Sequence, residues 1–149
     1  MPIWFVPNLT VEHLRPLLTD TLGGHLGIEF TGVGDDFIKG RMPVDNRTRQ
    51  PYGLLHGGAS VALAETLGSV AAAMVVDHSR FNAVGLEINA NHVRGAREGF
   101  VTGTTTPLHI GKTTQVWEIR ITDDRDRLIC VSRLTVAIIP KSPQSVGHL

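Results

Sequence analysis

Disulfide bonds are excluded within this chain, because its 149 residues include one cysteine, Cys130. A lone thiol suits a reducing compartment. The first ten residues also lack the basic flank and the long apolar segment of a secretory signal. We therefore expect the protein to work in the cytoplasm.

The chain also has no excess of positive or negative residues. Lysine plus arginine and aspartate plus glutamate number 14 each, so no overall field attracts nucleic acid or an anionic membrane, and neither is expected as a partner. Hydrophobic residues make up 42% of the chain, which favours a folded protein. The length suits one domain with a core better than two, so a single domain over residues 1–149 is predicted.

Three familiar site patterns do not occur. The seven histidines form no H-E-x-x-H motif, and one cysteine cannot supply a thiolate zinc site. The G-x-S-x-G turn of serine hydrolases is absent. Residues 111–113 read G-K-T, like the end of a phosphate-binding loop, but Thr106 occupies the place of the required earlier glycine. We therefore expect no metal and no redox cofactor.

The chain does contain one long apolar stretch, residues 57–76, in which Ala, Gly and Val dominate. A stretch of about 20 residues is long enough to cross a membrane. However, Glu65 lies at its centre, and Ser60, Thr66 and Ser69 add polarity. The stretch therefore predicts a central helix over about 57–76 that protein encloses on nearly every side.

A short helix and two strands are predicted before this central helix. The helix covers about 10–20, with Thr10 as its cap and Pro16 limiting its length. Two apolar segments, the first from Gly27 and the second ending near Val44, read as strands joined by a G-D-D turn.

The chain after Asn82 consists almost entirely of strand-like alternation, which predicts four antiparallel strands. Hairpin loops are expected between Thr122 and Arg127 and near Gly99, and the tail over about 141–149 is expected to be loose. One sheet and one apolar helix must share one core. A helix that is apolar nearly all round cannot lie on a flat sheet, so the sheet should curl around it or a second subunit should cover it.

The carboxylate of Glu65, inside the apolar helix, needs an explanation. An unpaired buried carboxylate costs several kcal/mol or stays neutral with a raised pKa, and no cation lies within one helical turn of it. Such a group can act as a nucleophile or as a general base. Ser69, four residues later on the same face, either positions Glu65 or an attacking water, or bonds back to the Glu65 carbonyl.

The helix start contains His56, Gly57 and Gly58. Two glycines cost backbone entropy there, so they indicate either a tight turn or an N–H group left open to a ligand. The positive end of a helix suits a developing oxyanion. The Gly57 N–H is therefore a candidate for polarising a carbonyl, and His56 is expected to orient the turn or the substrate.

The spacing of these two features predicts a shared site. Gly57 and Glu65 are eight residues apart, so their backbones are separated by about 12 Å, and a glutamate side chain reaches only part of that distance. Two antiparallel helices across a two-fold axis bring each helix start to the middle of its partner. We therefore expect a homodimer with two shared sites.

Three stretches of the chain resemble one enzyme family. Residues 53–69 resemble the signature of the hotdog-fold acyl-CoA thioesterases. They read G-L-L-H-G-G-A-S-V-A-L-A-E-T-L-G-S. The aryl-CoA subfamily has two further stretches that resemble L-E-I-N-A-N-H-V-R and P-L-H-I-G-K-T-T-Q-V-W in this chain. That subfamily includes 4-hydroxybenzoyl-CoA and 1,4-dihydroxy-2-naphthoyl-CoA thioesterases and the enterobactin-pathway proofreading thioesterase.

The resemblance implies an α+β hotdog fold, in which a curved antiparallel sheet of about six strands wraps one long central helix. It implies hydrolysis of an acyl-CoA, aromatic rather than aliphatic, with no cofactor beyond the CoA of the substrate. It also implies a dimer of dimers, a homotetramer. Small side chains at Ala71, Ala72 and Ala73, beside Val70, favour a broad flat slot for an aromatic group.

The resemblance also implies roles for individual residues. Glu65 is implied as nucleophile or base, and the Gly57 N–H as the donor to the thioester carbonyl. The Gln50 amide is a second contact to that carbonyl, and His56 and Ser69 complete the catalytic set. Substrate and CoA contacts are implied for Gly85, His92, Val93, Arg94, Gly95, His109, Ile110, Gly111, Lys112, Thr113 and Thr114. The cationic side chains among them suit the phosphates of CoA.

Two other functions on the same fold remain open. One is dehydration of 3-hydroxyacyl thioesters, and the other is non-catalytic binding of acyl-CoA. The combination of Gln50, Glu65 and Ser69 suits attack on a carbonyl better than elimination of water. A sensor would normally add a DNA-binding segment, and the chain has no spare basic helix.

Overall fold

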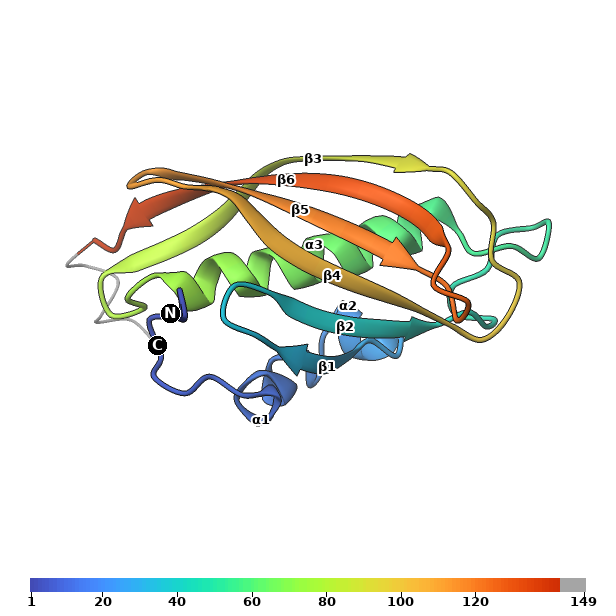
Figure 1. The fold of residues 1–149 in the computed structure, drawn as a ribbon, viewed down its shortest axis with the longest axis horizontal. Coiled ribbons are helices and arrows are strands. Elements are labelled where there is room, and N and C mark those ends of the chain that lie inside the picture. The colour runs from blue at the N-terminus through green and yellow to red at the C-terminus, as the bar shows by residue number, and fades with distance from the viewer. Residues whose placement is uncertain (143–149) are drawn as a thin grey trace.

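A computed structural model describes residues 1–142 of the chain. They form one antiparallel sheet of six strands, in the order β1-β2-β4-β5-β6-β3, that curves over one long helix (Figure 1). The strands are β1 Glu29–Val33, β2 Ile38–Pro43, β3 Phe81–His92, β4 Phe100–Ile110, β5 Thr114–Thr122 and β6 Leu128–Pro140. The helices are α1 Val11–Leu14, the 3-10 turn η1 Arg15–Leu18, α2 Leu22–His25 and α3 Gly57–Val75. The predicted hotdog architecture is thereby confirmed.

Helix α3 is the predicted central helix. Its 19 residues contain no proline and six alanines, which favours a continuous helix. It ends at Val75, one residue earlier than predicted, because Val76 adopts an extended conformation. Its length and its mean hydropathy of 1.5 would suit a membrane span, but half of this stretch is buried inside the fold. Enclosure within one chain is thus less complete than predicted, and one stripe of α3 stays uncovered.

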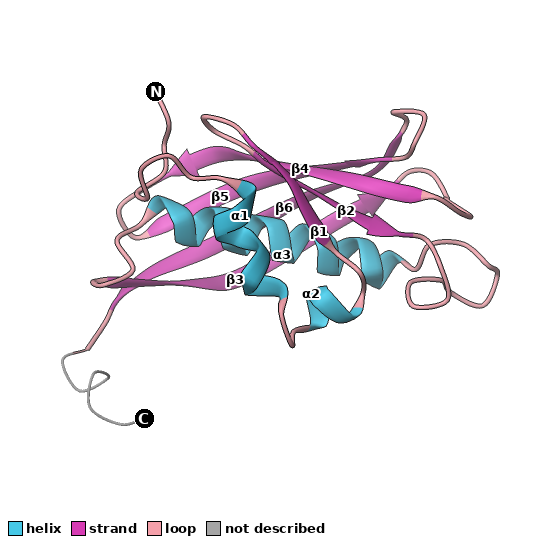
Figure 2. Cartoon of the chain, turned by 90° about the horizontal axis from the view of Figure 1, so that it is seen from below, coloured by secondary structure: helices cyan, strands magenta, loops and turns pink. Residues whose placement is uncertain are grey.

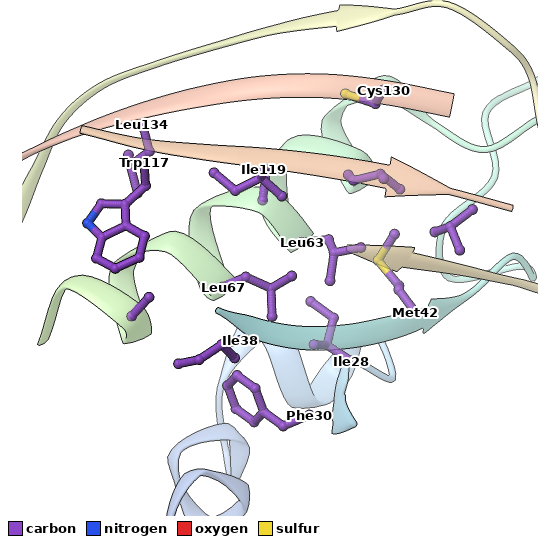
Figure 3. Packing of buried hydrophobic residues seen from close by; sticks show 14 of the residues in the cluster. Ile28, Phe30, Ile38, Met42, Leu63, Leu67, Trp117, Ile119, Cys130 and Leu134 are labelled. Carbon is purple, nitrogen blue, oxygen red and sulfur yellow. The ribbon is translucent and has the colours of Figure 1, made fainter. Parts of the chain in front are cut away.

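One core fills the space between α3 and the concave face of the sheet (Figure 3). Leu67 of α3, Trp117 of β5 and Leu134 of β6 all have 0% of their surface exposed. The sheet approaches Leu67 closely, because a Cβ atom on Gly40 or Gly103 would lie 2.7 or 2.6 Å from its methyl carbons. Burying one leucine side chain stabilises a fold by about 1.5–3 kcal/mol, so this contact helps to fix α3 against the sheet.

The N-terminal segment differs from the single helix predicted over about 10–20. It forms the two short pieces α1 and η1 and ends at Leu18, and Pro16 lies inside the 3-10 turn. A second piece, α2, was not predicted; Thr21 caps it by accepting the Gly24 N–H at 3.2 Å. Contacts join α1 to β1 and α2 to α3 (Figure 2).

One expected hairpin is wrong. Strand β3 pairs with β6 and not with β4, the next strand in sequence, so β3 forms an edge of the sheet. The segment around Gly99 is therefore a connection from the sheet edge to its interior. The hairpin expected between Thr122 and Arg127 is confirmed, because β5 pairs with β6. From residue 143 on, the predicted loose tail lies outside the described residues.

Candidate active site

Glu65 lies in the middle of α3 with its carboxylate toward β3. Its Oε2 atom is buried and has no hydrogen-bond partner within residues 1–142, and no ion pair in that range involves it. Burial raises the pKa of Glu65 above its ordinary value, because the charged form loses water without gaining a partner. The carboxylate is thus unpaired in this chain, as the sequence indicated.

Gly85 on β3 provides the space for this carboxylate. A Cβ atom on Gly85 would lie 2.7 Å from Glu65 Oε1. The pairing of β3 with β6 shifts by one residue between Gly85 and Glu87, so Leu86 is the extra residue of a β-bulge. Bulges bend a strand and re-aim its side chains. Glu65, Gly85 and Leu86 line one hollow between α3 and β3, which we call the carboxylate hollow.

The start of α3 presents an open N–H group. His56 caps the helix through Nδ1, which accepts the Gly58 N–H at 2.7 Å. The Gly57 N–H has no hydrogen-bond partner among residues 1–142. A neutral imidazole that accepts at Nδ1 carries its hydrogen on Nε2. His56 therefore holds the turn in shape and leaves the Gly57 N–H available.

Gln50 faces the same place from the loop that precedes α3. Its Oε1 accepts the backbone N–H groups of Tyr52 and Leu54, so its NH₂ group stays free to donate. Gln50 and Gly57 line one hollow, the helix-start hollow. The His92 ring also lines this hollow and lies next to Gly57, because a Cβ atom on Gly57 would lie 3.0 Å from His92 Nε2. Two residues with uncommitted hydrogen-bond donors thus line one cavity.

Some of the other residues that line the helix-start hollow were predicted, and others were not. Those implied as substrate contacts and found here are His92, Val93, Arg94 and Gly95. Ser60 also lines the hollow although only 1% of it is exposed, and it was not predicted as a site residue. The available signal was its spacing of three residues from Gly57, since such positions share one face of a helix.

Several predicted site residues are not brought together within one chain. The carboxylate hollow of Glu65 and the helix-start hollow of Gly57 share no lining residue. The segment His109–Thr114 lies at the Gly85 end of the sheet, since Gly85 and Gln115 both pair with Val136 of β6, and far from the helix-start hollow. Along β6, the partner of Thr114 lies seven residues beyond the partner of His92, which corresponds to about 23 Å of strand.

Ser69 lies one turn beyond Glu65. Its hydroxyl makes no hydrogen bond within residues 1–142, so the alternative of a bond back to the Glu65 carbonyl does not occur. Thr66 makes such a bond instead, from its Oγ1 to the Ala62 carbonyl at 2.7 Å. The Ser69 hydroxyl therefore remains available for a polar partner.

The slot expected at the alanine run is wrong. Ala71 and Ala72 are 0% exposed and belong to the core, because this part of α3 turns them toward the sheet. The small apolar side chains that lie near Glu65 are Val61 and Ala62, one turn before it. The hollow beside Glu65 is therefore lined by an earlier part of α3 than expected.

Known proteins resemble this chain over most of its length. A family model described as the thioesterase superfamily matches residues 52–130. The 1,4-dihydroxy-2-naphthoyl-CoA hydrolase of Escherichia coli is 53% identical over 89% of this chain and 96% of its own length. The proofreading thioesterase EntH of Cronobacter turicensis is 49% identical over the same shares of the two chains. A solved thioesterase structure from Haemophilus influenzae matches with a TM-score of 0.88 and 47% identity, over 93% of this chain and 95% of that one.

Proposed function

This chain belongs to the thioesterase superfamily and hydrolyses acyl-CoA thioesters, and from this we propose that its acyl group is aromatic and that Glu65 drives the attack. The dehydratase and non-catalytic alternatives are thereby set aside. One observation carries the proposal, the buried and unpartnered carboxylate of Glu65. A carboxylate without a structural partner, in a chain of this family, is best explained by a role in the reaction.

We place the thioester carbonyl oxygen at the Gly57 N–H, with the Gln50 amide as second donor. The ionised Glu65 either attacks the carbonyl carbon or takes a proton from a water that attacks it, and the Ser69 hydroxyl orients that water. In the water route, the new C–O bond turns the carbonyl oxygen into an oxyanion that the two donors stabilise. Collapse of this intermediate expels the CoA thiolate, which takes up a proton. One such donor contributes about 3–4 kcal/mol to lowering a barrier.

Each site is proposed to be shared between two subunits, because the two hollows of one chain do not meet. Edge strand β3 exposes 44% of Val84 and 63% of Leu86, and part of α3 is uncovered. A second copy that pairs along β3, with its α3 antiparallel, would cover both surfaces. The partner's Gly57 would then face this chain's Glu65. A dimer of dimers in the cytoplasm completes the proposal.

An aromatic acyl group suits the carboxylate hollow. Apolar side chains of small or medium size line it beside Glu65, namely Val61, Ala62 and Ile88. One relative is named as a hydrolase of 1,4-dihydroxy-2-naphthoyl-CoA, whose acyl group is aromatic. A flat ring can lie against such a surface, whereas a long saturated chain needs a deep channel.

The test is release of free thiol from a panel of acyl-CoAs that includes benzoyl, hydroxynaphthoyl, butyryl and palmitoyl thioesters. We expect kcat/KM to be highest for the two aromatic substrates and lowest for palmitoyl-CoA. A preference for palmitoyl-CoA would contradict the aromatic assignment. Absence of thiol release from every member of the panel would contradict the function itself.

Gly85→Ala is expected to keep the fold and to lower kcat by roughly tenfold or more, because the new methyl group must displace the Glu65 carboxylate. The displaced atoms are the flexible end of a side chain, so Tm should change little. The matched control is Gly32→Ala on β1, where a Cβ atom meets only Lys39 at an ordinary 3.7 Å. Wild-type kcat in Gly85→Ala would show that Gly85 does not set the position of Glu65.

A further inference from the structure

The β-bulge of β3 gives Leu86 an unusual position. Side chains alternate between the two faces of a sheet, and Gly85 and Ile88 lie opposite buried residues of β6, on the core side. Leu86 is the extra residue between them. It stays outside the hydrophobic core and is 63% exposed, yet it lines the carboxylate hollow beside Glu65. The bulge thus gives a large apolar side chain to this hollow instead of to the core.

The carboxylate hollow has two apolar walls that come from different elements. Val61 and Ala62 of α3 form one wall, and Leu86 and Ile88 of β3 form the other. Ile88 is held in place because it packs against the core. Leu86 has no such packing, so its side chain is the part of β3 that sets the distance between the two walls.

The walls of this hollow offer shape to a ligand and few hydrogen bonds. Besides Glu65, the one polar side chain that lines it within residues 1–142 is Glu87. The carboxylate of Glu87 already accepts the Asn89 side-chain amide at 3.0 and 3.2 Å. The Gly58 N–H is bonded to His56, and the other lining residues are apolar or glycine. A hollow of this kind distinguishes acyl groups by how well they fit.

We propose that Leu86 is a specificity-determining residue, which makes the carboxylate hollow a slot for flat acyl groups. The inference rests on the proposed function, which places the acyl group beside Glu65. A planar ring can enter edgewise between Leu86 and Val61. A puckered ring of the same size is thicker, so it must push the leucine side chain aside. The enzyme should therefore prefer aromatic to alicyclic acyl groups because of their thickness, and not because of their length or polarity.

The test compares benzoyl-CoA with cyclohexanecarbonyl-CoA, whose rings have the same size and differ in thickness. In Leu86→Ala, the ratio of kcat/KM for benzoyl-CoA to that for cyclohexanecarbonyl-CoA should fall by roughly tenfold, because the slot opens. The intrinsic difference in reactivity between the two thioesters cancels when the ratio is compared with that of wild type. The matched control is Val84→Ala, which removes another exposed apolar side chain from β3, at a position that does not line the hollow. Its ratio should equal that of wild type.

Two further variants keep the test decisive if Leu86→Ala does not fold. Leu86→Met conserves the side-chain volume and should keep the wild-type ratio, whereas Leu86→Phe narrows the slot and should raise the ratio. An unchanged ratio in both Leu86→Ala and Leu86→Phe, or an equal fall in Val84→Ala, would overturn the inference. The proposed function would survive that result, because both thioesters would still be hydrolysed. A wild-type protein that releases thiol from neither substrate would instead overturn the proposed function.

Discussion

Glu65→Gln is expected to lose nearly all thioester hydrolysis while keeping the fold. Glutamine has the shape of glutamate but can neither attack a carbonyl nor take a proton from water, so kcat should fall by roughly 10²–10⁴-fold. No partner of the Glu65 carboxylate is lost, since residues 1–142 supply none. The fall in kcat should therefore come without a loss of stability.

The same variant carries a signature in its dependence on pH. The pKa of Glu65 is raised in the folded chain, so the folded state holds this proton more tightly than the unfolded state. Wild type therefore loses stability as pH rises from the ordinary glutamate pKa through the raised one. Glu65→Gln lacks this loss, so its Tm should equal or exceed that of wild type at neutral pH. The acidic limb of the wild-type kcat profile should lie above the ordinary glutamate pKa, because the reaction needs the carboxylate.

Thermal unfolding and thiol release, each followed against pH, measure both effects on the same samples. Glu65→Ala provides a second variant, which removes the side chain as well as its charge. A Glu65→Gln protein that unfolds readily but hydrolyses thioesters normally while folded would identify Glu65 as a structural group. The proposed mechanism would then be wrong.

Gly57→Val is expected to have the second large effect, a fall in kcat of roughly 10²–10³-fold. A Cβ atom on Gly57 would already lie 3.0 Å from His92 Nε2. The further methyl groups of valine would enter the helix-start hollow, where the carbonyl oxygen is placed at the Gly57 N–H. Gly57 has a negative φ, as valine requires, so the helix start should still form.

Gly57→Ala should lie between wild type and Gly57→Val, because its single methyl group displaces His92 without filling the hollow. Gly32→Val, at an open position on β1, controls for adding valine to the chain. Circular dichroism establishes that each variant is folded before kcat is compared. Equal activity in wild type and Gly57→Val would remove the N–H of this residue from the mechanism.

Local features of the fold could be predicted from the sequence, and pairing between distant segments could not. The composition of residues 57–76 predicted α3 within one residue. Two apolar segments joined by a turn predicted the first two strands, and alternation predicted the other four. The connection near Gly99 was mistaken for a hairpin because it is short. That β3 instead pairs with β6 depends on contacts between residues far apart in sequence, which no local pattern encodes.

The site was predictable to the same extent. Glu65 and Gly57 were identifiable because a carboxylate and two glycines are out of place in an apolar helix. The role of Gly85 beside Glu65 was not, because it follows from a bulge in β3 and from the approach of α3.

Two subunits are proposed to build each site, and mixing of inactive subunits tests this arrangement. One inactive protein carries Gln50→Ala with Gly57→Val, and the other carries Glu65→Gln. A mixed dimer contains one site with both defects and one site with neither. Random exchange at equal concentrations should therefore restore about a quarter of the wild-type activity. Mass spectrometry of tagged subunits verifies the exchange, and verified exchange without recovered activity would contradict the shared site.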